Sequence, residues 1–448
     1  MRMYPLPDPF LVNMKEMLGG EFPAFLSALE EPPALALRLN PKRADAEAAA
    51  QAYTDGPVPW ERRGRYLSQS GALRPGSSIA HAAGAFYMQE ASAMASAAVL
   101  DAQPGERVLD LCAAPGSKST QIAAAMGDAG LLVSNDPEPD RARSLAGNLE
   151  RMGAANAIVV SALPEKLAAR WPEYFDAVLT DAPCSGEGMF RRDPASRAEW
   201  SPAAPEGCAK RQAEILDRAA QLLRPGGRLI YSTCTFNSLE NEGSVRAFLA
   251  RHPDFTFENF NLPGAGASRE GMLRLLPHCL RGDGHFVAKL RKAGATPLAA
   301  QDRPIRVDRE TAEQLRALER EACSLPEAIR SMQPFMLRDR LYCRPWGSPP
   351  LDGLRVVSPG LCLARVGRSH IEPEYALAMA LPPELAHRYA LLDESQALAW
   401  LRGEAIPMEG QRGWTLALYH NLPLGWGKLS DGMLKNHLPK GLRRVSKA

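Results

Sequence analysis

The chain has 448 residues, of which 45% are hydrophobic and 23% charged, and its formal net charge is +2. This balance is typical of a globular protein of about three domains, and the lack of any run of about 18 apolar residues argues against a membrane span. Eight cysteines without a CxxC pair or regular spacing argue against a disulfide framework and a zinc site, so we expect reduced thiols and no metal. The start, MRMYPLPDPF, carries prolines and an aspartate where a signal peptide needs an apolar run, so we expect a cytoplasmic protein.

Residues 1–90 are predicted to form a small α+β domain. Residues 14–29 have a helix-like pattern, residues 35–41 (LALRLNP) indicate a strand, and the alanine-rich residues 46–53 are typical of a helix. A short strand-like run, YLSQS, follows before the pattern changes near residue 90.

Residues 91–292 alternate strand-like and helix-like segments, which is typical of parallel βαβ units in a doubly wound, Rossmann-like α/β sheet. Five strands are predicted at residues 107–112, 131–136, 157–160, 176–183 and 228–234, with helices at 119–126, 141–153 and 208–223. The Pro-Gly-Gly sequence at 225–227 is expected to end the last of these helices. The runs at 255–260 and 284–292 indicate closing strands, with an antiparallel edge pair as one option.

The rest of the chain is predicted to hold smaller, β-rich modules. Residues 293–385 comprise a linker-like segment to about residue 304, a helix at 309–322 and short strands rich in glycine and proline, and residues 386–448 form a last β-rich module. Its end carries one acid, Asp431, against the basic residues Lys428, Lys435, Lys440, Arg443, Arg444 and Lys447. These residues could follow the phosphates of a nucleic acid, or could form a solvated terminus that aids solubility.

The loop after the first strand of the 91–292 segment has the features of a cofactor site. It reads Cys112-Ala113-Ala114-Pro115-Gly116-Ser117-Lys118 and leads into a helix. Ligands of doubly wound sheets bind at the carboxyl ends of strands, where small residues let the backbone approach and helix N–H groups meet negative charge. The loop has neither the GxGxxG pattern of a dinucleotide site nor the spacing of a Walker loop. It suits the methionine carboxylate of S-adenosylmethionine instead.

An acid follows the second strand, about 20 residues after this loop. Asp136 is well placed to bind ribose hydroxyls, and Arg141 can contact the nucleoside or pair with Asp136. The alternative for Asp136 is a helix N-cap, because Asp-Pro often starts a helix. We favour the ribose role.

The fourth and fifth strands end in residues that can carry out covalent chemistry. The fourth ends at Asp181-Ala182-Pro183-Cys184 and the fifth at Thr233-Cys234. Neighbouring strands of such a sheet bring their carboxyl ends to one cleft, so we expect Asp181 and the two thiols to converge beside the cofactor. A thiolate that adds to C6 of cytosine makes C5 nucleophilic, a carboxyl group near N3 shares a proton with the ring, and a second thiol can help the elimination.

Several segments resemble the Nol1/Nop2/Sun family of RNA cytosine-C5 methyltransferases. They are LRLNPK, GAFYMQEASAM, CAAPGSKS, DAPCSGEGMFRRDP, RPGGRLIYSTCT, LENE and GDGHFVAKL. The stretches GLRVVSPGLCLARVG and GWGKLSDGMLKNHLPKGLRR resemble the RsmF-like branch, which methylates bacterial ribosomal RNA. The resemblance covers nearly the whole chain, and the paired Pro-Cys and Thr-Cys motifs are its most discriminating part.

The resemblance implies a role for each matching residue. Cys234 would be the nucleophile, Cys184 would assist release of the product, and Asp181 would contact the cytosine or the methionine end of the cofactor. It also implies an N-terminal RNA-binding domain, a PUA-like C-terminal module and 16S ribosomal RNA as the substrate. The family often has an acid or amide near the adenine where this chain has Ala162, so Ser161 or a backbone group is expected to take that contact.

Basic, amide and aromatic residues provide candidate RNA contacts, and for Arg38, Asn40 and Lys42 the contact is what the family resemblance implies. They are Arg38, Asn40, Lys42, Phe86, Tyr87, Arg191, Arg192, Arg197, Lys210, Arg211, Trp414 and Trp426. Ordinary surface charge is the alternative for the basic residues, and core packing is the alternative for the aromatic ones. A base inside a duplex is out of reach, so the target cytosine must be single-stranded or flipped out.

Other functions remain open at this point. A DNA cytosine-C5 methyltransferase would use the Pro-Cys cysteine as its nucleophile, and the substrate could be transfer RNA instead of ribosomal RNA. A non-catalytic RNA-binding assembly factor would tolerate loss of the cofactor loop or of Cys234, both of which are intact. We expect a monomer that binds S-adenosylmethionine and RNA and no membrane.

Overall fold

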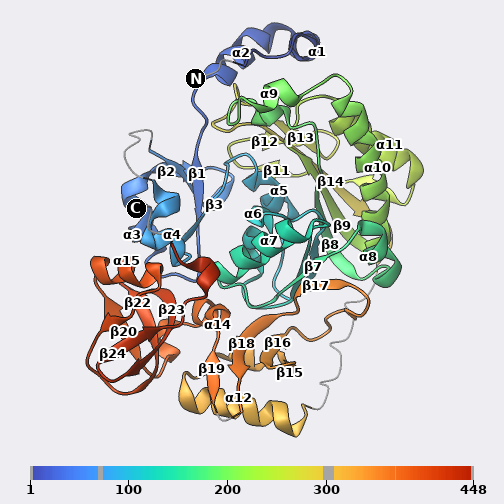
Figure 1. Cartoon of the computed structure of the whole chain (residues 1–448). Coiled ribbons are helices and arrows are strands. Elements are labelled where there is room, and N and C mark those ends of the chain that lie inside the picture. Colours follow the sequence, from blue (N-terminus) through green and yellow to red (C-terminus); the bar gives the residue numbers. More distant parts are fainter. Residues whose placement is uncertain (1–3, 69–73, 296–306, 369, 445–448) are drawn as a thin grey trace.

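The computed structural model describes residues 4–68, 74–295, 307–368 and 370–444. Figure 1 shows their arrangement. The N-terminal region begins with helices α1 (Asp8–Leu18) and α2 (Phe22–Glu30). An antiparallel sheet in the order β2-β3-β1-β4 follows. Its elements are β1 (Ala36–Leu39), α3 (Ala46–Ala50), β2 (Thr54–Val58), β3 (Glu61–Leu67), α4 (Ile79–Ala82) and β4 (Phe86–Met88).

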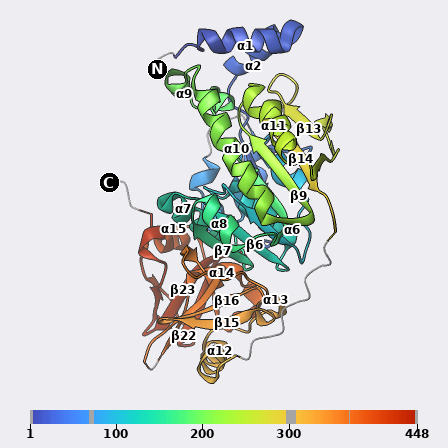
Figure 2. The same cartoon turned by 90° about the vertical axis from the view of Figure 1, so that its right-hand side faces the viewer.

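The two N-terminal helices pack over loops of the central domain and not on this sheet. Phe10 of α1 meets Phe190 edge-on with the ring centroids 5.0 Å apart, and Phe25 of α2 meets Phe236 at 5.2 Å. Both views place α1 and α2 at the opposite end of the molecule from the C-terminal sheets (Figures 1 and 2). Helices α1 and α2 therefore pack against the central domain, whereas the N-terminal sheet belongs to a different hydrophobic core.

A nine-stranded sheet forms the centre of the described part of the chain. Its order is β10-β14-β9-β8-β5-β6-β7-β17, with β13 paired to β14. The parallel strands are β5 (Arg107–Asp110), β6 (Leu131–Asn135), β7 (Ala157–Ser161), β8 (Phe175–Asp181) and β9 (Leu223–Thr233). The antiparallel strands are β10 (Phe255–Phe257), β13 (Met272–Leu275), β14 (His285–Lys292) and β17 (Arg355–Ser358). The predicted Rossmann-like sheet with antiparallel closing strands is confirmed.

Helices cover both faces of this sheet because alternate strand residues are apolar on both sides. Val108 and Leu132 face α5 (Met94–Leu100), α6 (Ser117–Met126) and α7 (Pro139–Arg151). Leu109 and Val133 face the opposite side, which is covered by α8 (Pro164–Arg170), α10 (Ala204–Leu222) and α11 (Ser244–Arg251). The short elements α9 (Ser196–Glu199), β11 (Asn261–Leu262) and β12 (Gly266–Ala267) lie in connecting loops.

The Pro-Gly-Gly sequence at 225–227 does not end the helix before the last parallel strand. Helix α10 ends at Leu222, and β9 already begins at Leu223. The strand pairing with β8 shifts between Leu223 and Arg228, so the Pro-Gly-Gly residues form an irregularity within β9. The prediction for this segment was wrong because proline and glycine mark a strand bulge as well as a helix end.

The first C-terminal sheet follows the predicted linker, most of which lies outside the described residues. It has the order β15-β16-β18-β19. Its elements are α12 (Arg309–Glu321), α13 (Glu327–Arg330), β15 (Gln333–Leu337), β16 (Arg340–Arg344), β18 (Leu361–Val366) and β19 (Ile371–Pro373). The stretch 353–367 supplies two strands to two sheets, because β17 pairs with β7 of the central sheet and β18 pairs with β16.

The last sheet shares a core with the N-terminal sheet. It has the order β20-β22-β23-β24-β21. Its region comprises α14 (Tyr375–Ala380), β20 (Tyr389–Leu392), α15 (Glu394–Arg402), β21 (Ile406–Pro407), β22 (Gly413–Tyr419), β23 (Leu422–Ser430) and β24 (Met433–Asn436). Leu37 and Phe86 of the N-terminal sheet belong to the same apolar cluster as Trp400 and Leu434. The N-terminal sheet and the last sheet are therefore packed together, as Figure 1 shows.

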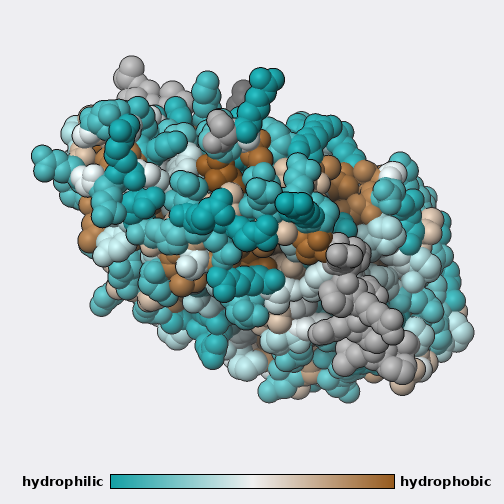
Figure 3. All heavy atoms as spheres, turned by 90° about the horizontal axis from the view of Figure 1, so that it is seen from below, coloured by the Kyte–Doolittle hydropathy of each residue, from teal (hydrophilic) through white to brown (hydrophobic). Residues whose placement is uncertain are grey.

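The surface on the side of the C-terminal sheets is mostly hydrophilic, with small hydrophobic patches (Figure 3). Large exposed apolar side chains in the C-terminal sheets include Tyr389 and Leu391, each 60% exposed. Among the described residues, no helix combines the length and apolar character that crossing a membrane would need.

Candidate active site

Two cysteine thiols meet at the carboxyl edge of the central sheet. Cys184 follows β8 and Cys234 follows β9, and these strands are parallel neighbours in which Asp181 pairs with Ser232. The Sγ atoms of Cys184 and Cys234 are 3.3 Å apart, and both residues are partly exposed. The expected convergence of the two strand ends is therefore present. The hydrogen bond to Cys234 and burial both raise the pKa of Cys184 well above its ordinary value, so Cys184 is a neutral thiol that can donate to its neighbour.

A buried carboxylate, Glu240, ties the two cysteine loops together. It accepts hydrogen bonds from Ser185 N at 3.0 Å and from Asn237 Nδ2 at 2.7 Å, and Ser185 Oγ also donates to it. Gln212 of α10 donates to the same carboxylate at 2.8 Å and to the carbonyl of Pro183 at 3.1 Å. Glu240 has no exposed surface. These bonds fix the Cys184 loop against the turn that follows Cys234.

A second buried carboxylate, Glu187, makes the reciprocal link. It follows Cys184 and accepts bonds from the backbone N–H groups of Phe236 and Asn237, both at 2.9 Å. The N–H of Gly188 donates to the carbonyl of Cys234 at 2.8 Å, and a Cβ at Gly188 would lie 2.7 Å from that oxygen. Glu187 was not predicted as a site residue from the sequence, and Glu240 of the LENE motif was given no role. The available signal was their position as acids within or just after the two cysteine motifs.

Asp181 lies beside the thiols, accepts two side-chain hydrogen bonds and has a third polar neighbour. Lys118 Nζ donates to its Oδ2 at 2.7 Å and Ser232 Oγ donates to its Oδ1 at 2.8 Å, while His285 Nε2 lies 3.5 Å from Oδ1. Burial raises the pKa of Asp181, but Lys118 and His285 outweigh it and hold the pKa below its ordinary value. Asp181 is therefore an ionised acceptor whose side chain is still 30% exposed.

The loop predicted to bind the cofactor runs from β5 into the first turn of α6. Gly116 has a φ of 110°, which favours glycine, and a Cβ there would lie 3.0 Å from Leu145 Cδ1. Cys112 lies beside Asp110, and burial raises the pKa of its thiol. Lys118, at the other end of the loop, reaches Asp181. The loop thus joins the predicted cofactor site to the two thiols.

Asp136 and Arg141 lie next to this loop. Asp136 is 1% exposed, accepts a bond from Glu138 N at 3.0 Å and lies 3.4 Å from Arg141 Nη2. Helix α7 begins only at Pro139, so Asp136 is not its N-cap residue. Arg141 also donates to the carbonyl of Ala114 at 3.0 Å. The pairing of Arg141 with Asp136, one of the two expected arrangements, is the one observed.

The donors expected near the adenine are already used within the protein. The N–H of Ala162 donates to Asn135 Oδ1 at 3.0 Å, and the hydroxyl of Ser161 donates to the carbonyl of Pro137 at 3.1 Å. Leu163, the next residue, is 54% exposed at the carboxyl end of β7. Leu163 was not predicted as a site residue, because an isolated leucine carries no motif.

The residues at this edge fit S-adenosylmethionine. Three buried polar atoms near the carboxyl ends of β5, β6 and β8 have no hydrogen-bond partner among the described residues, namely Asp110 Oδ1, Ser134 Oγ and Thr180 Oγ1. Burial raises the pKa of Asp110 to about 7. A molecule with an amino group, a carboxylate and ribose hydroxyls can supply the partners that such atoms require.

Several predicted RNA contacts instead hold the protein together. Arg38 is 1% exposed and donates to Gln89 and Thr120, and Asn40 donates to the carbonyls of Gly84 and Met152. Lys42 pairs with Asp128 at the end of α6. These side chains attach the N-terminal sheet to the central domain, because Arg38 lies on the inner strand β1 and Asn40 and Lys42 lie in the turn after it, where their polar groups meet neighbouring elements.

The other predicted contacts divide into buried and exposed residues. Phe86 is fully buried and Tyr87 is 6% exposed, while Trp414 and Trp426 are 3% and 1% exposed and belong to a core cluster. Arg191 and Arg192 pair with Asp283, and Arg197 pairs with Glu30. Lys210 and Arg211 on α10 are exposed. Of the C-terminal basic residues, Lys447 lies outside the described residues, and Lys428 and Lys435 lie on β23 and β24.

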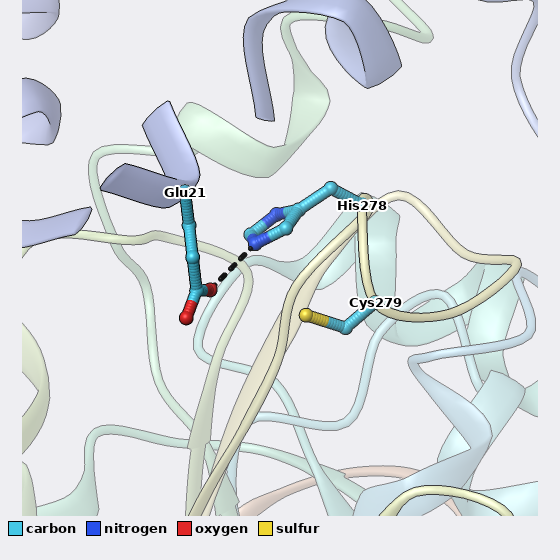
Figure 4. A group of neighbouring side chains, drawn as sticks. All are labelled: Glu21, His278 and Cys279. Carbon is cyan, nitrogen blue, oxygen red and sulfur yellow. Dashed lines mark hydrogen bonds and ion pairs between the residues drawn. The ribbon is translucent and has the colours of Figure 1, made fainter. Parts of the chain in front are cut away.

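A separate cluster near the N-terminal helices contains Glu21, His278 and Cys279 (Figure 4). Glu21 Oε2 lies 3.0 Å from His278 Nε2, while Glu21 and Cys279 are exposed. A metal on Nε2 would shift the imidazole proton to Nδ1, which is buried and has no hydrogen-bond partner among the described residues. We therefore interpret the cluster as a contact that ties the N-terminal helices to the central domain.

The sequence matches four family descriptions in chain order. They are the N-terminal domain of 16S rRNA methyltransferase RsmF at residues 6–91, 16S rRNA methyltransferase RsmB/F at 97–291, the RsmF first C-terminal domain at 321–381 and the RsmF PUA domain at 391–444. Relatives named ribosomal RNA small subunit methyltransferase F, from Escherichia coli O127:H6 and Shigella boydii serotype 18, are each 33% identical over 98% of this chain and 97% of their own length.

Solved structures extend the comparison. A methyltransferase homolog from Pyrococcus horikoshii is 28% identical, with a TM-score of 0.55 over 64% of this chain and 95% of that one. The structure of NSun6 from the same organism with SFG has a TM-score of 0.57 at 21% identity, over 66% of this chain and 100% of that one, and supports the fold.

Proposed function

Because the chain belongs to the RsmB/F family of 16S rRNA methyltransferases, which depend on S-adenosylmethionine, we propose that it methylates C5 of a cytosine in small-subunit ribosomal RNA through a covalent bond between Cys234 and C6. The observation that carries this proposal is the pair of thiols 3.3 Å apart beside the Lys118–Asp181 ion pair. A methyltransferase that acts on a nucleophilic oxygen or nitrogen needs no such thiols, whereas C5 of cytosine needs covalent activation.

Cys234 begins the reaction by adding its sulfur to C6 of the ring. The electrons of the C5–C6 double bond move toward the ring carbonyl and N3, and C5 becomes nucleophilic. The neutral Cys184 thiol donates a hydrogen bond to Cys234, which stabilises the thiolate before it attacks. Because Asp181 is ionised, the ammonium group of Lys118 is the donor that offsets the charge developing on the ring, and Asp181 accepts a bond from the base.

Release of the product requires the opposite movement of electrons. The C5 proton passes to water at this partly exposed edge of the sheet, the C5–C6 double bond forms again, and the electrons of the S–C6 bond return to Cys234. Cys184 stabilises the departing thiolate by the same hydrogen bond. We propose that this contact is the way in which Cys184 assists release.

The cofactor is held by the loop from Cys112 to Lys118 and by Asp136. When bound, S-adenosylmethionine supplies an electrophilic methyl group. We propose that Asp136 accepts bonds from the ribose and that the first turn of α6 meets the methionine carboxylate. Leu163 packs against the adenine in place of the missing acid, since an aromatic base ring can bury this exposed apolar side chain.

RNA is the partner that this function requires. The exposed Lys210 and Arg211 of α10 can contact its phosphates, and the C-terminal sheet matches a PUA domain of RNA methyltransferases. We propose that this sheet and the N-terminal sheet act together on the substrate, because they share one hydrophobic core.

Nucleoside analysis of 16S rRNA tests the proposal. The chain is expressed in cells that lack their own enzymes of this family, and the RNA is analysed by mass spectrometry and bisulfite sequencing. We expect 5-methylcytidine at a defined cytosine that is absent without the chain. Methylation at N4 or on a ribose oxygen, or 5-methylcytidine found in transfer RNA and not in 16S rRNA, would contradict the proposal.

A further inference from the structure

The imidazole of His285 is a buried group that the reaction described above does not use. His285 begins β14, which is antiparallel to β9, and the next residue, Phe286, pairs with Thr233. Because β14 runs opposite to β9, the first residue of β14 lies beside the carboxyl end of β9, and the His285 side chain reaches the site there. The side chain is 3% exposed, and Nε2 has no hydrogen-bond partner among the described residues. Leaving a buried nitrogen without a hydrogen-bond partner costs free energy of folding.

The backbone before His285 fixes where the ring lies. Gly284 has a φ of 112°, and a Cβ at this position would lie 2.4 Å from the ring of Phe236. The N–H of Gly284 donates to Ser92 Oγ at 3.1 Å, and the N–H of Asp283 donates to Glu90 Oε1 at 2.9 Å. The loop therefore has little freedom to carry the ring elsewhere.

His285 faces the carboxylate of Asp181. Its Nε2 lies 3.5 Å from Asp181 Oδ1, longer than a normal hydrogen bond, and such contacts often shorten when substrate binds. The charged groups that act on the ring are Lys118 from α6, Asp181 from β8 and Glu90 from the turn after β4. Burial and the charge of Lys118 lower the pKa of His285, so the ring is neutral and its proton is available for donation.

We propose that His285 is a positioning residue for Asp181, to which its neutral ring donates an Nε2–H···Oδ1 hydrogen bond. Lys118 then holds Oδ2, while Ser232 and His285 hold Oδ1. This arrangement fixes the plane of the carboxylate and leaves a free lone pair on the exposed side for the base. The inference rests on the proposed function, because it assigns Asp181 to the cytosine.

Exchange of His285 for phenylalanine and for glutamine tests the inference. His285→Phe keeps the size of the side chain and removes the donor, whereas His285→Gln keeps an N–H group near the position of Nε2. We expect His285→Phe to lower kcat about 10- to 100-fold with little change in KM for RNA or in affinity for S-adenosylmethionine, because a bond to a charged acceptor is lost. His285→Gln should recover most of the rate.

The pH profile separates positioning from a merely structural role. Because His285 helps to lower the pKa of Asp181, its removal lets that pKa rise. The acid limb of kcat/KM should therefore move to higher pH in His285→Phe and return toward the native value in His285→Gln. An unmoved acid limb, or a kcat within about twofold of the native value, overturns the inference.

Two further measurements complete the test. His252→Gln is the matched control, because His252 Nε2 also faces an aspartate, Asp217 at 2.9 Å, but follows α11 and has a side chain that is 23% exposed. It should leave kcat and the profile unchanged. Long-range ¹H–¹⁵N NMR of the native protein should find the proton of His285 on Nε2, and a proton on Nδ1 overturns the inference even if a variant fails to fold. This readout does not depend on methylation at C5, so failure of the proposed function is seen separately in the nucleoside analysis.

Discussion

The carboxyl edge of the central sheet leaves its polar side chains partly open, whereas the C-terminal five-stranded sheet encloses its two tryptophans. Asp181, Cys184 and Cys234 are each only partly covered. Trp414 and Trp426 are 3% and 1% exposed, and Trp414 Nε1 donates to the carbonyl of Ile371 at 2.9 Å. At the sheet edge, strand direction decides which side chains meet. In the five-stranded sheet, the largest side chains lie inside because they fill the hydrophobic core.

The largest effect is expected from removal of the thiol of Cys234. Cys234→Ala should reduce methyl transfer below a few per cent of the native rate, because it removes the sulfur that adds to C6, while the raised pKa of the neighbouring Cys184 keeps that thiol neutral. Incorporation of tritiated methyl groups into 16S rRNA measures this loss. Cys279→Ala is the control, since Cys279 is exposed and lies outside the cleft. A Cys234→Ala protein with substantial activity would refute covalent catalysis at this edge of the sheet.

The second thiol should affect release more than attack. Cys184→Ala removes the hydrogen bond that stabilises the departing thiolate, so a covalent protein–RNA adduct should accumulate. A shifted band on a denaturing gel detects the adduct. The double variant Cys184→Ala/Cys234→Ala should show no such band. If Cys184→Ala also shows no shifted band, the contact between the two thiols does not assist release of the product.

Substitutions in the C-terminal sheet should change the free energy of unfolding and not the rate of methyl transfer. Trp426→Ala should lower the free energy of unfolding of its region by about 3–5 kcal/mol, because a fully buried indole leaves a large cavity. Tyr389→Ala, with a side chain 60% exposed on β20, should change it by less than about 0.5 kcal/mol. Urea titrations followed by circular dichroism compare the two. Unchanged stability of Trp426→Ala together with weaker RNA binding would favour a stacking surface after all.

The sequence was informative where topology alone places a residue. The alternation of strands and helices, the loop after β5 and the two cysteines at the ends of β8 and β9 could all be predicted, because parallel strands bring their carboxyl ends together. The same reasoning could not find His285, which reaches the site from an antiparallel strand. It could not find Glu187 either, because the hydrogen bonds of this carboxylate depend on how two loops fold against each other.

The errors have a common physical origin. Arg38, Asn40 and Lys42 were predicted to meet RNA because the family resemblance implies substrate contact there, but these side chains bond to groups of the central domain. The Pro-Gly-Gly residues at 225–227 were assigned to a helix end although they form an irregularity in a strand. The sequence shows which polar groups need a hydrogen-bond partner, but only the folded structure shows which partner each group has.

The core shared by the first and last sheets has a consequence for biosynthesis. Leu37 and Phe86 emerge from the ribosome hundreds of residues before Leu434 and Leu438, against which their cluster is built. Until the final strands are translated, the early sheet has an uncovered apolar side, a state that invites chaperone binding. Completion of the fold therefore has to wait for the end of translation, and a nonsense mutation near the end of the reading frame would damage the first-made domain as well as the last.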